Sequence, residues 1–486
     1  MRLKSALRRG VAAAVIAGIV VSSGIPAYAA RWDIANGDIT VKAGDTEGTN
    51  KVTQGETIDK DDTNTVITGE SDKNTVTIDT SEGNVDVTFD DLKIDVSGKA
   101  EGDVSGDGPV DAGKAAVTVQ GDHDAAIELD GANELKSGSC NAGLEKNGNE
   151  SSGKLTIKDD NDTKGSLTAE GGEDGAGIGG GKESSGATNI EITGDALVSA
   201  GSSGGASIGS GESSTGETTI NIHDTNPEKG VKSAFAYGGA GIGSGRYAKG
   251  KTYVTISNAS VSTLETPAAS TNTSGAGIGT GYGSQSDAEI TITESTVKAV
   301  GGTGAAIGSG SEGDVFSPPT GDPNTFKTII RITDSNVTAS SGPSAAIGSG
   351  SYSTNATEIH INGGKIEASN YSGSAIGSGD SAKGKTGIYI TGSNVTATAD
   401  IGTGIGSGTS SSGETTIDIS GGTVTAMGGG DGYDGSAGIG SGSHSTGYTH
   451  ITLHDGVTVK ATGGGNSSLG GGGGAGIGSG NRAKGN

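Results

Sequence analysis

Hydrophobic and polar residues alternate along the chain in short runs, which glycine-rich loops separate. In the stretch 408–439, the run 416–420 places Ile417 and Ile419 on one side of an extended strand, because strand side chains alternate with a period of two. A Gly-Gly bend follows, and a second alternating run covers 423–426. This stretch therefore predicts two short strands joined by a tight bend, and then a loop that leads into the next glycine-rich block.

The same arrangement recurs along the chain, and an isoleucine inside a block reading GAGIGSG, AAIGSG or a near variant marks each copy. These isoleucines lie about 30 to 40 residues apart, a spacing typical of solenoids in which each repeat packs only on its neighbours. The isoleucines that we expect to form the structural core are Ile178, Ile208, Ile242, Ile278, Ile307, Ile347, Ile376, Ile405, Ile439 and Ile477.

Each block supplies a third short strand, so three short strands make one turn of about 30 residues. The sequence therefore predicts an all-β fold, a right-handed parallel β-helix (solenoid), since connections between parallel strands are right-handed by default. The glycines of each block permit a positive φ at the corner and a close approach of neighbouring coils.

The first segment of the chain, 1–30, is typical of a secretory signal peptide. It has a basic start, an apolar run at 11–21 and a small-x-small cleavage site at 27–29. The apolar run is too short to span a bilayer, and no later segment approaches that length, so no transmembrane segment is expected. We expect the mature protein to be secreted or extracellular.

The rest of the chain divides at about residue 135 into two segments. Residues 31–135 are acidic and contain irregular alternating runs, which indicate an N-terminal cap or divergent early coils. Regular β-helix repeats fill 136–486. The last repeat stops in mid-coil at Asn486, so we expect a truncated C-terminus and attachment to a cell surface through the missing region.

The composition is glycine-rich and acidic, with 95 glycines and a net charge of −25. Such a charge repels nucleic acid and favours solubility, so we expect no nucleic-acid partner. Cys140 is the only cysteine, so no disulfide within the chain stabilises it. Stability must come from a long stacked core, and we expect a monomeric rod.

One acidic segment resembles a calcium-binding loop. Asp103, Ser105 and Asp107 occupy its first, third and fifth positions, and Asp111 follows, but Lys114 stands where a carboxylate should close the site. Solvated acidic turns are the alternative. Calcium is therefore a candidate ligand, and no other cofactor is expected.

Aromatic rings recur shortly after the block isoleucine in four coils, at Tyr247, Tyr282, Tyr352 and His444. Rings along one edge of a rod can stack on sugar rings, so these are candidate ligand-binding residues. Scattered surface tyrosines are the alternative, because other coils have serine or arginine at the corresponding position.

Enzymes of the β-helix class place acidic or basic side chains in a cluster on one strand face. The expected outward positions of the first strands hold no carboxylate pair on successive coils. Arg331 and His360, on neighbouring coils, are the one pair there that suggests catalysis. The sequence therefore predicts no catalysis, with a polysaccharide lyase or glycosidase as the alternative. Charged side chains from the insert 312–327 would favour that alternative if they folded onto Arg331 and His360.

Three segments of the chain resemble a known group of proteins. They are ELDGANEL at 128–135, GSLTA at 165–169 and GAGIGG at 175–180. The group is the exported GAGIGSG-repeat parallel β-helix surface proteins of Gram-positive gut bacteria, and the resemblance covers about residues 125–486. Members are commonly described as adhesin-like or carbohydrate-binding, and they have no defined catalytic residues to carry over. The resemblance thus implies a secreted or cell-surface scaffold whose partner is a polysaccharide or a host or cell-surface ligand.

Overall fold

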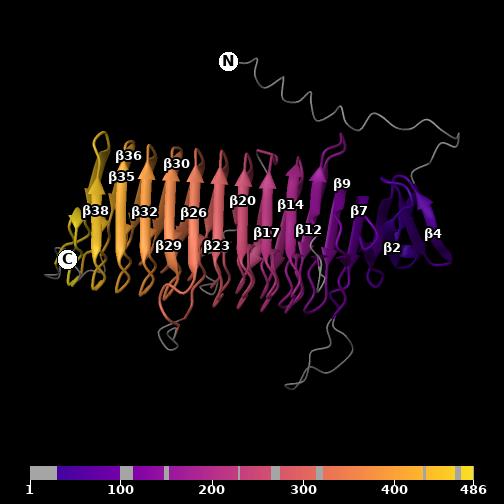
Figure 1. Ribbon diagram of the computed structural model, residues 1–486, viewed down its shortest axis with the longest axis horizontal. Helices are drawn as coiled ribbons and strands as arrows, with labels where there is room; N and C mark the ends of the chain where they lie inside the picture. Colours follow the sequence, from indigo (N-terminus) through magenta and orange to yellow (C-terminus); the bar gives the residue numbers. More distant parts are fainter. Residues whose placement is uncertain are drawn as a thin grey trace, which may run out of the picture.

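A computed structural model describes residues 30–98, 113–146, 153–227, 230–263, 274–313, 321–430, 434–465 and 472–484. These residues form an elongated parallel β-helix, whose coils succeed one another from the indigo N-terminal end to the yellow C-terminal end in Figure 1. Each regular coil contributes three strands, and these stack along the rod into three faces. The parallel β-helix predicted from the alternating pattern is therefore confirmed.

Face 1 holds the first strand of each regular coil, paired in parallel with the first strand of the next coil. Its strands are β11 (Leu155–Asp159), β14 (Thr188–Gly194), β17 (Thr218–His223), β20 (Thr252–Ser257), β23 (Ala288–Thr293), β26 (Lys327–Thr333), β29 (Ala356–Asn362), β32 (Thr386–Thr391), β35 (Thr415–Ser420) and β38 (Thr449–Leu453).

Face 2 holds the second strands, again paired in parallel from coil to coil. Its strands are β12 (Gly165–Glu170), β15 (Leu197–Ser202), β18 (Val231–Ala236), β21 (Ser260–Thr263), β24 (Thr296–Val300), β27 (Asn336–Ser341), β30 (Lys365–Asn370), β33 (Asn394–Ala399), β36 (Thr423–Met427) and β39 (Thr458–Thr462).

Face 3 holds the third strands, which are very short in the regular coils and contain the block isoleucine. Its parallel strands are β2 (Ile39–Ala43), β6 (Val76–Asp79), β8 (Val117–Gln120), β10 (Leu144–Lys146), β13 (Ile178–Gly179), β16 (Ile208–Gly209), β19 (Ile242–Gly243), β22 (Ile278–Gly279), β25 (Ile307–Gly308), β28 (Ile347–Gly348), β31 (Ser374–Gly377), β34 (Thr403–Gly406), β37 (Ile439–Gly440) and β40 (Ile477–Gly478).

The N-terminal coils differ from the regular ones, because two of their strands run without a break across faces 1 and 2. These strands are β7 (Val85–Asp95) and β9 (Ala125–Lys136), and β9 pairs with both β11 and β12. The same stack begins with β1 (Arg31–Asp33), which the short 3-10 helix η2 (Ile34–Asn36) follows, and β5 (Val66–Ser71).

Two antiparallel strands, β3 (Asn50–Gln54) and β4 (Thr57–Asp62), extend face 3 beyond the first coil. Trp32 Nε1 donates a hydrogen bond to Asp62 Oδ2 at 2.8 Å, and Lys60 Nζ lies 5.4 Å from the centroid of the indole ring. These contacts hold β4 against the first coil, where Trp32 is buried. Residues 31–135 thus combine early coils with an antiparallel pair at the end of the rod.

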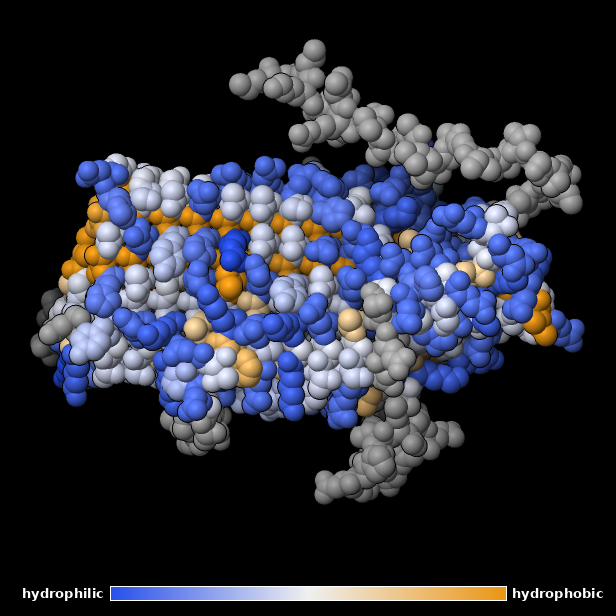
Figure 2. All heavy atoms as spheres, viewed as in Figure 1, coloured by the Kyte–Doolittle hydropathy of each residue, from blue (hydrophilic) through white to orange (hydrophobic). Residues whose placement is uncertain are grey.

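The inward side chains form one continuous hydrophobic core along the rod. The block isoleucines from Ile178 to Ile439 are fully buried, and each pairs in register with the isoleucine of the next coil. Ile477 was expected in the core but is 47% exposed. Its coil packs against the coil of Ile439 on one side, and no described coil covers the other side. Residues of like hydropathy form rows along the rod in Figure 2, as expected where corresponding positions of successive coils lie in register.

The glycine after each block isoleucine is required by the geometry of face 3. Gly348, for example, has a φ of +145°, and a Cβ at this position would overlap the carbonyl oxygen of Gly377 in the next coil. The equivalent glycines have φ between +130° and +145°, and the same close neighbour wherever a next coil is described. Both predicted roles of the block glycines are therefore present, the positive φ and the close approach.

A hydroxyl residue inside seven of the blocks forms a buried ladder that the alternating pattern does not reveal. In each case the side-chain oxygen accepts a hydrogen bond from a glycine N–H of the next coil, at 2.9 to 3.2 Å. The accepting residues are Ser210, Ser244, Thr280, Ser309, Ser349, Ser378 and Ser407. The ladder satisfies backbone donors that would otherwise be buried without a partner.

We expect Ser349→Ala to lower the free energy of unfolding by about 1–3 kcal/mol, because it leaves the buried N–H of Gly379 without its acceptor. Urea unfolding followed by circular dichroism measures this change. Ser369→Ala is the matched control, since Ser369 is exposed on face 2. Equal unfolding midpoints for the two variants would contradict the role of the ladder.

Candidate functional site

The four aromatic residues expected to form a ladder do not form one continuous surface. Tyr247 and Tyr282 contact each other, with ring centroids 5.6 Å apart and ring planes at 67°. Tyr247, Tyr352 and His444 share a left-handed backbone position with φ of 57° to 59°, but Gly283 takes that position in the coil of Tyr282. Serines take it in the two coils between Tyr352 and His444. The structure therefore brings together only the first two of the four candidates.

The candidate calcium residues Asp103, Ser105, Asp107 and Asp111 lie outside the described residues. Within the residues that the structure describes, no group of three His, Cys, Asp or Glu side chains could hold a metal ion.

The outward positions expected on the first strands do form a column along face 1. Its register pairs Arg331 with His360, His360 with Tyr389, and Tyr389 with Asp418, on four successive coils. The isoleucines on either side of each residue are buried, so the column lies on the outer surface of face 1.

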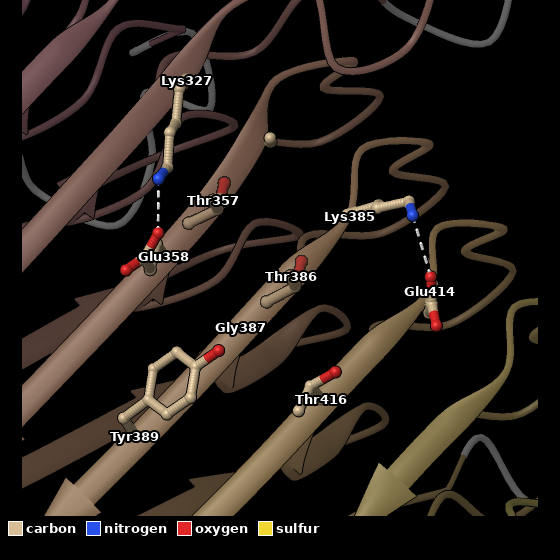
Figure 3. A pocket seen from close by; sticks show the side chains of 10 residues that line it. Lys327, Thr357, Glu358, Lys385, Thr386, Gly387, Tyr389, Glu414 and Thr416 are labelled. Carbon is tan, nitrogen blue, oxygen red and sulfur yellow. Dashed lines mark ion pairs between the residues drawn. The ribbon is translucent and has the colours of Figure 1, made fainter.

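Two members of this column, His360 and Tyr389, form a stacked pair that we call the aromatic shelf. Their ring centroids lie 4.9 Å apart and their planes differ by 13°. Gly387 lies two residues before Tyr389 on the same side of β32, and a Cβ there would approach Tyr389 Cε2 to 3.0 Å. The missing side chain at Gly387 thus leaves room for the tyrosine ring to lie over the strand (Figure 3).

Two shallow depressions flank the aromatic shelf. The first, of about 210 Å³, is lined by Lys327, Glu358, Lys385, Glu414 and Thr416 together with Tyr389 (Figure 3). The second, of about 350 Å³, lies along the Arg331 side of the pair and is lined by both rings and by polar residues of β26, β29 and β32. Tyr389 lines both depressions, so its ring forms the ridge between them.

The carboxylates of the first depression are held by neighbouring cations. Glu358 contacts Lys327 Nζ through Oε2, and its Oε1 lies 2.6 Å from His360 Nε2. Lys385 Nζ lies 3.0 Å from Glu414 Oε2. Hydrogen bonds to Lys327 and then His360 lower the pKa of Glu358, and the bond to Lys385 lowers the pKa of Glu414. Both groups are therefore ionised at neutral pH and present oxygens that accept hydrogen bonds.

The side chains considered for catalysis have other partners. Arg331 Nη1 forms an ion pair with Glu289 at 2.5 Å, while Glu358 and Tyr389 hold the ring of His360. Of the insert 312–327, the described residues add Lys327 to this region. Glu312 lies elsewhere, where its Oε2 accepts a hydrogen bond from the backbone N–H of Thr354 at 2.9 Å.

A second cluster of charged side chains lies beside face 3, and the pattern of residues along the chain does not predict it. Asp174 precedes β13, whereas Lys182, Glu212 and Arg246 follow the third strands of their coils. Asp174 and Glu212 share a hydrogen bond across two coils, Lys182 Nζ lies 2.8 Å from Asp174, and Arg246 Nη2 lies 2.5 Å from Glu212. Burial and then the bond to Asp174 raise the pKa of Glu212. For Asp174, burial acts to raise the pKa, but the hydrogen bonds to Glu212 and Lys182 together lower it.

This pair makes stability depend on pH. Because the pKa of Glu212 is raised in the fold, its contribution is present at low pH and is lost as the pH rises through that pKa. We expect Glu212→Gln to remove this loss, which urea unfolding at several pH values measures. Glu217→Gln is the control, because Glu217 lies in the same loop but is exposed. The same pH profile for wild type and Glu212→Gln would contradict the raised pKa of Glu212.

The residues around the aromatic shelf were only partly visible in the sequence. His360 is one of the expected outward positions, and Tyr389 holds the corresponding position one coil later, but their stacking was not predicted. One signal could have shown this stacking. It is a glycine two residues before an outward tyrosine, together with an aromatic residue in register on the previous coil. The pairing of Glu358 and Glu414 with lysines was missed, because only the outward position between the two buried residues of each first strand was compared from coil to coil.

Comparison with known proteins supports the fold and names no activity. A family model described as a beta helix repeat matches residues 163–182, 290–311, 330–351, 359–380 and 417–443. The search of curated proteins and the search of solved structures gave no match. Among the described residues, no helix is long and apolar enough to cross a membrane. The repeat matches and the stacked coils together support a parallel β-helix repeat protein.

Proposed function

We propose that this protein is a secreted or cell-surface scaffold, adhesin-like, that binds a polysaccharide on face 1 without cleaving it. The observation that carries the proposal is the aromatic shelf, which lies between two depressions lined by polar side chains. A flat aromatic ring offers an apolar surface to the faces of sugar rings, and Tyr389 is 37% exposed. No calcium ion is needed for this mode of binding.

The polar groups around the shelf suit the hydroxyl groups of sugars. Ionised Glu358 and Glu414 accept hydrogen bonds, and bonds to an ionised acceptor are stronger than neutral ones. Their lysine partners fix both carboxylates in place before a ligand arrives, which reduces the entropy lost on binding.

The same electrostatics favour binding over hydrolysis, the alternative function for this fold. A glycosidase needs one carboxylic acid with a raised pKa to protonate the leaving group. Glu358 and Glu414 have lowered pKa values, so neither suits that role. A lyase or glycosidase would therefore need groups other than these two.

We expect Tyr389→Ala to weaken polysaccharide binding by about tenfold, because the shelf loses its exposed ring. Affinity electrophoresis of residues 31–486 against soluble plant, mucin and bacterial polysaccharides identifies a retained polysaccharide, and calorimetry then measures its affinity for each variant. Tyr389→Phe keeps the ring and should bind nearly as wild type does.

Tyr371→Ala is the control for a general loss of surface tyrosine, since Tyr371 is 55% exposed and lies between faces 2 and 3. The site on face 1 is contradicted if Tyr371→Ala and Tyr389→Ala weaken binding equally.

A further inference from the structure

We infer that the binding surface continues diagonally across face 1 from Tyr389 to Tyr448, and that it selects an extended neutral glycan longer than a disaccharide. This inference rests on the proposed glycan-binding function and adds the size, path and charge of the ligand.

The strand register sets out the path. Gly387 pairs with Thr416 in the next coil, and Thr416 pairs with His450 in the coil after that. Tyr389 lies one coil before Thr416 and two residues further along the strand direction. Tyr448 lies one coil after Thr416 and two residues back along that direction. The three residues lie on one straight diagonal of the outer surface.

The diagonal has two exposed rings with a small residue between them. Tyr448 is 61% exposed and Tyr389 is 37% exposed, while Thr416 is exposed and lines the depression beside Tyr389. Two coils and four strand residues separate the two tyrosine Cα atoms by about 16 Å. A disaccharide cannot reach from one ring to the other, so a ligand that uses both rings is a longer chain.

Two carboxylates flank the middle of the path, one within β35 and one directly before it. Glu414 lies two residues before Thr416 and Asp418 two residues after it, with side chains that are 42% and 39% exposed. Asp418 Oδ1 lies 3.0 Å from His454 Nε2, and Glu414 contacts Lys385 and, at 3.6 Å, His450. A sugar hydroxyl can donate to these oxygens. The cations beside them are already engaged by these carboxylates, so they offer little attraction to a uronate or sulfate group. The charge of the path therefore favours a neutral glycan.

The test uses residues 31–486 and two sets of probes. The first set compares neutral polysaccharides, a galactomannan and a mixed-linkage β-glucan, with polygalacturonate. The second set is a series of oligosaccharides, from disaccharide to octasaccharide, prepared from the retained neutral polysaccharide. Affinities are measured by calorimetry for wild type, Tyr389→Ala, Tyr448→Ala and Tyr371→Ala, after thermal unfolding has shown that each variant is folded.

We expect wild type to bind longer oligosaccharides about tenfold more tightly than the disaccharide, and Tyr448→Ala to lose that gain without a change in disaccharide binding. Tyr389→Ala should weaken both, and polygalacturonate should not be retained. Wild-type affinity of Tyr448→Ala for the octasaccharide, or retention of polygalacturonate, would overturn the inference and leave the shelf at Tyr389 standing. Failure of wild type to retain any polysaccharide would instead contradict the proposed function itself.

Discussion

Replacing Gly348 with alanine is expected to lower the free energy of unfolding by more than about 4 kcal/mol, a loss as large as single substitutions give. The new Cβ would overlap the carbonyl oxygen of Gly377 in the next coil, and the backbone φ of +145° is one that side chains rarely adopt. The adjacent coils cannot move away, because the same close contact joins Gly308 to Gly348 and Gly348 to Gly377 along face 3. Thermal unfolding of the purified variant measures the effect.

The control for Gly348→Ala is a glycine with positive φ but free space. Gly392, in the bend between β32 and β33, has a φ of +62°, and no atom lies within 4 Å of the place that a Cβ would occupy. Asn258 occupies the equivalent bend of another coil with a positive φ. Gly392→Asn should therefore leave the transition nearly unchanged. A similar midpoint for Gly348→Ala and Gly392→Asn would show that the close approach on face 3 is not what requires glycine.

Ile307→Asp is expected to have an effect of similar size, again more than about 4 kcal/mol. Ile307 is fully buried and pairs with Ile278 before it and Ile347 after it. A carboxylate at this position would be surrounded by hydrocarbon in the middle of the rod. Its neighbours in the stack are isoleucines, which cannot pair with its charge.

Ile477→Asp is the matched control, because Ile477 has the same place in its coil but is 47% exposed. It should leave the unfolding midpoint almost unchanged, as measured by circular dichroism on heating. Equal destabilisation by the two substitutions would contradict the explanation that burial, rather than the block sequence itself, makes Ile307 essential.

The fold could be predicted because each of its requirements leaves a local signal. Alternation of polar residues with Ile and Val, as at 416–420, identifies a strand with one buried side, and the recurring block gives the length of the coil. The fate of Ile477 could not be predicted in this way. Its block reads like the others, and its exposure depends only on what packs beside it in space.

The binding surface was predicted less well than the fold, because it depends on how side chains of neighbouring coils orient against one another. Tyr282 comes one residue earlier after its block than Tyr247 does, and the two rings meet edge to face instead of continuing a ladder. The stacking of His360 on Tyr389 joins residues that are far apart in sequence but in register across two strands. Each residue follows its block isoleucine, Ile347 or Ile376, by the same number of positions, so counting gives the register but not the face-to-face stacking of the two rings.

The buried ladder of block hydroxyls shows another limit of the sequence. A serine between two glycines, as at Ser349, has the composition of a solvated loop. In the structure its side chain is enclosed and accepts a hydrogen bond from the next coil. Burial inside a solenoid corner gives a polar residue a structural role that its hydropathy does not indicate.

The measurement that tests the central claim most directly is incubation of residues 31–486 with the panel of soluble polysaccharides, scored for both retention and integrity. Affinity electrophoresis reports retention, and size-exclusion chromatography with an assay for new reducing or unsaturated ends reports cleavage. A scaffold that binds on face 1 predicts retention of a neutral polysaccharide whose size distribution stays unchanged. Shortening of the polysaccharide, or the absence of retention across the panel, would contradict the account.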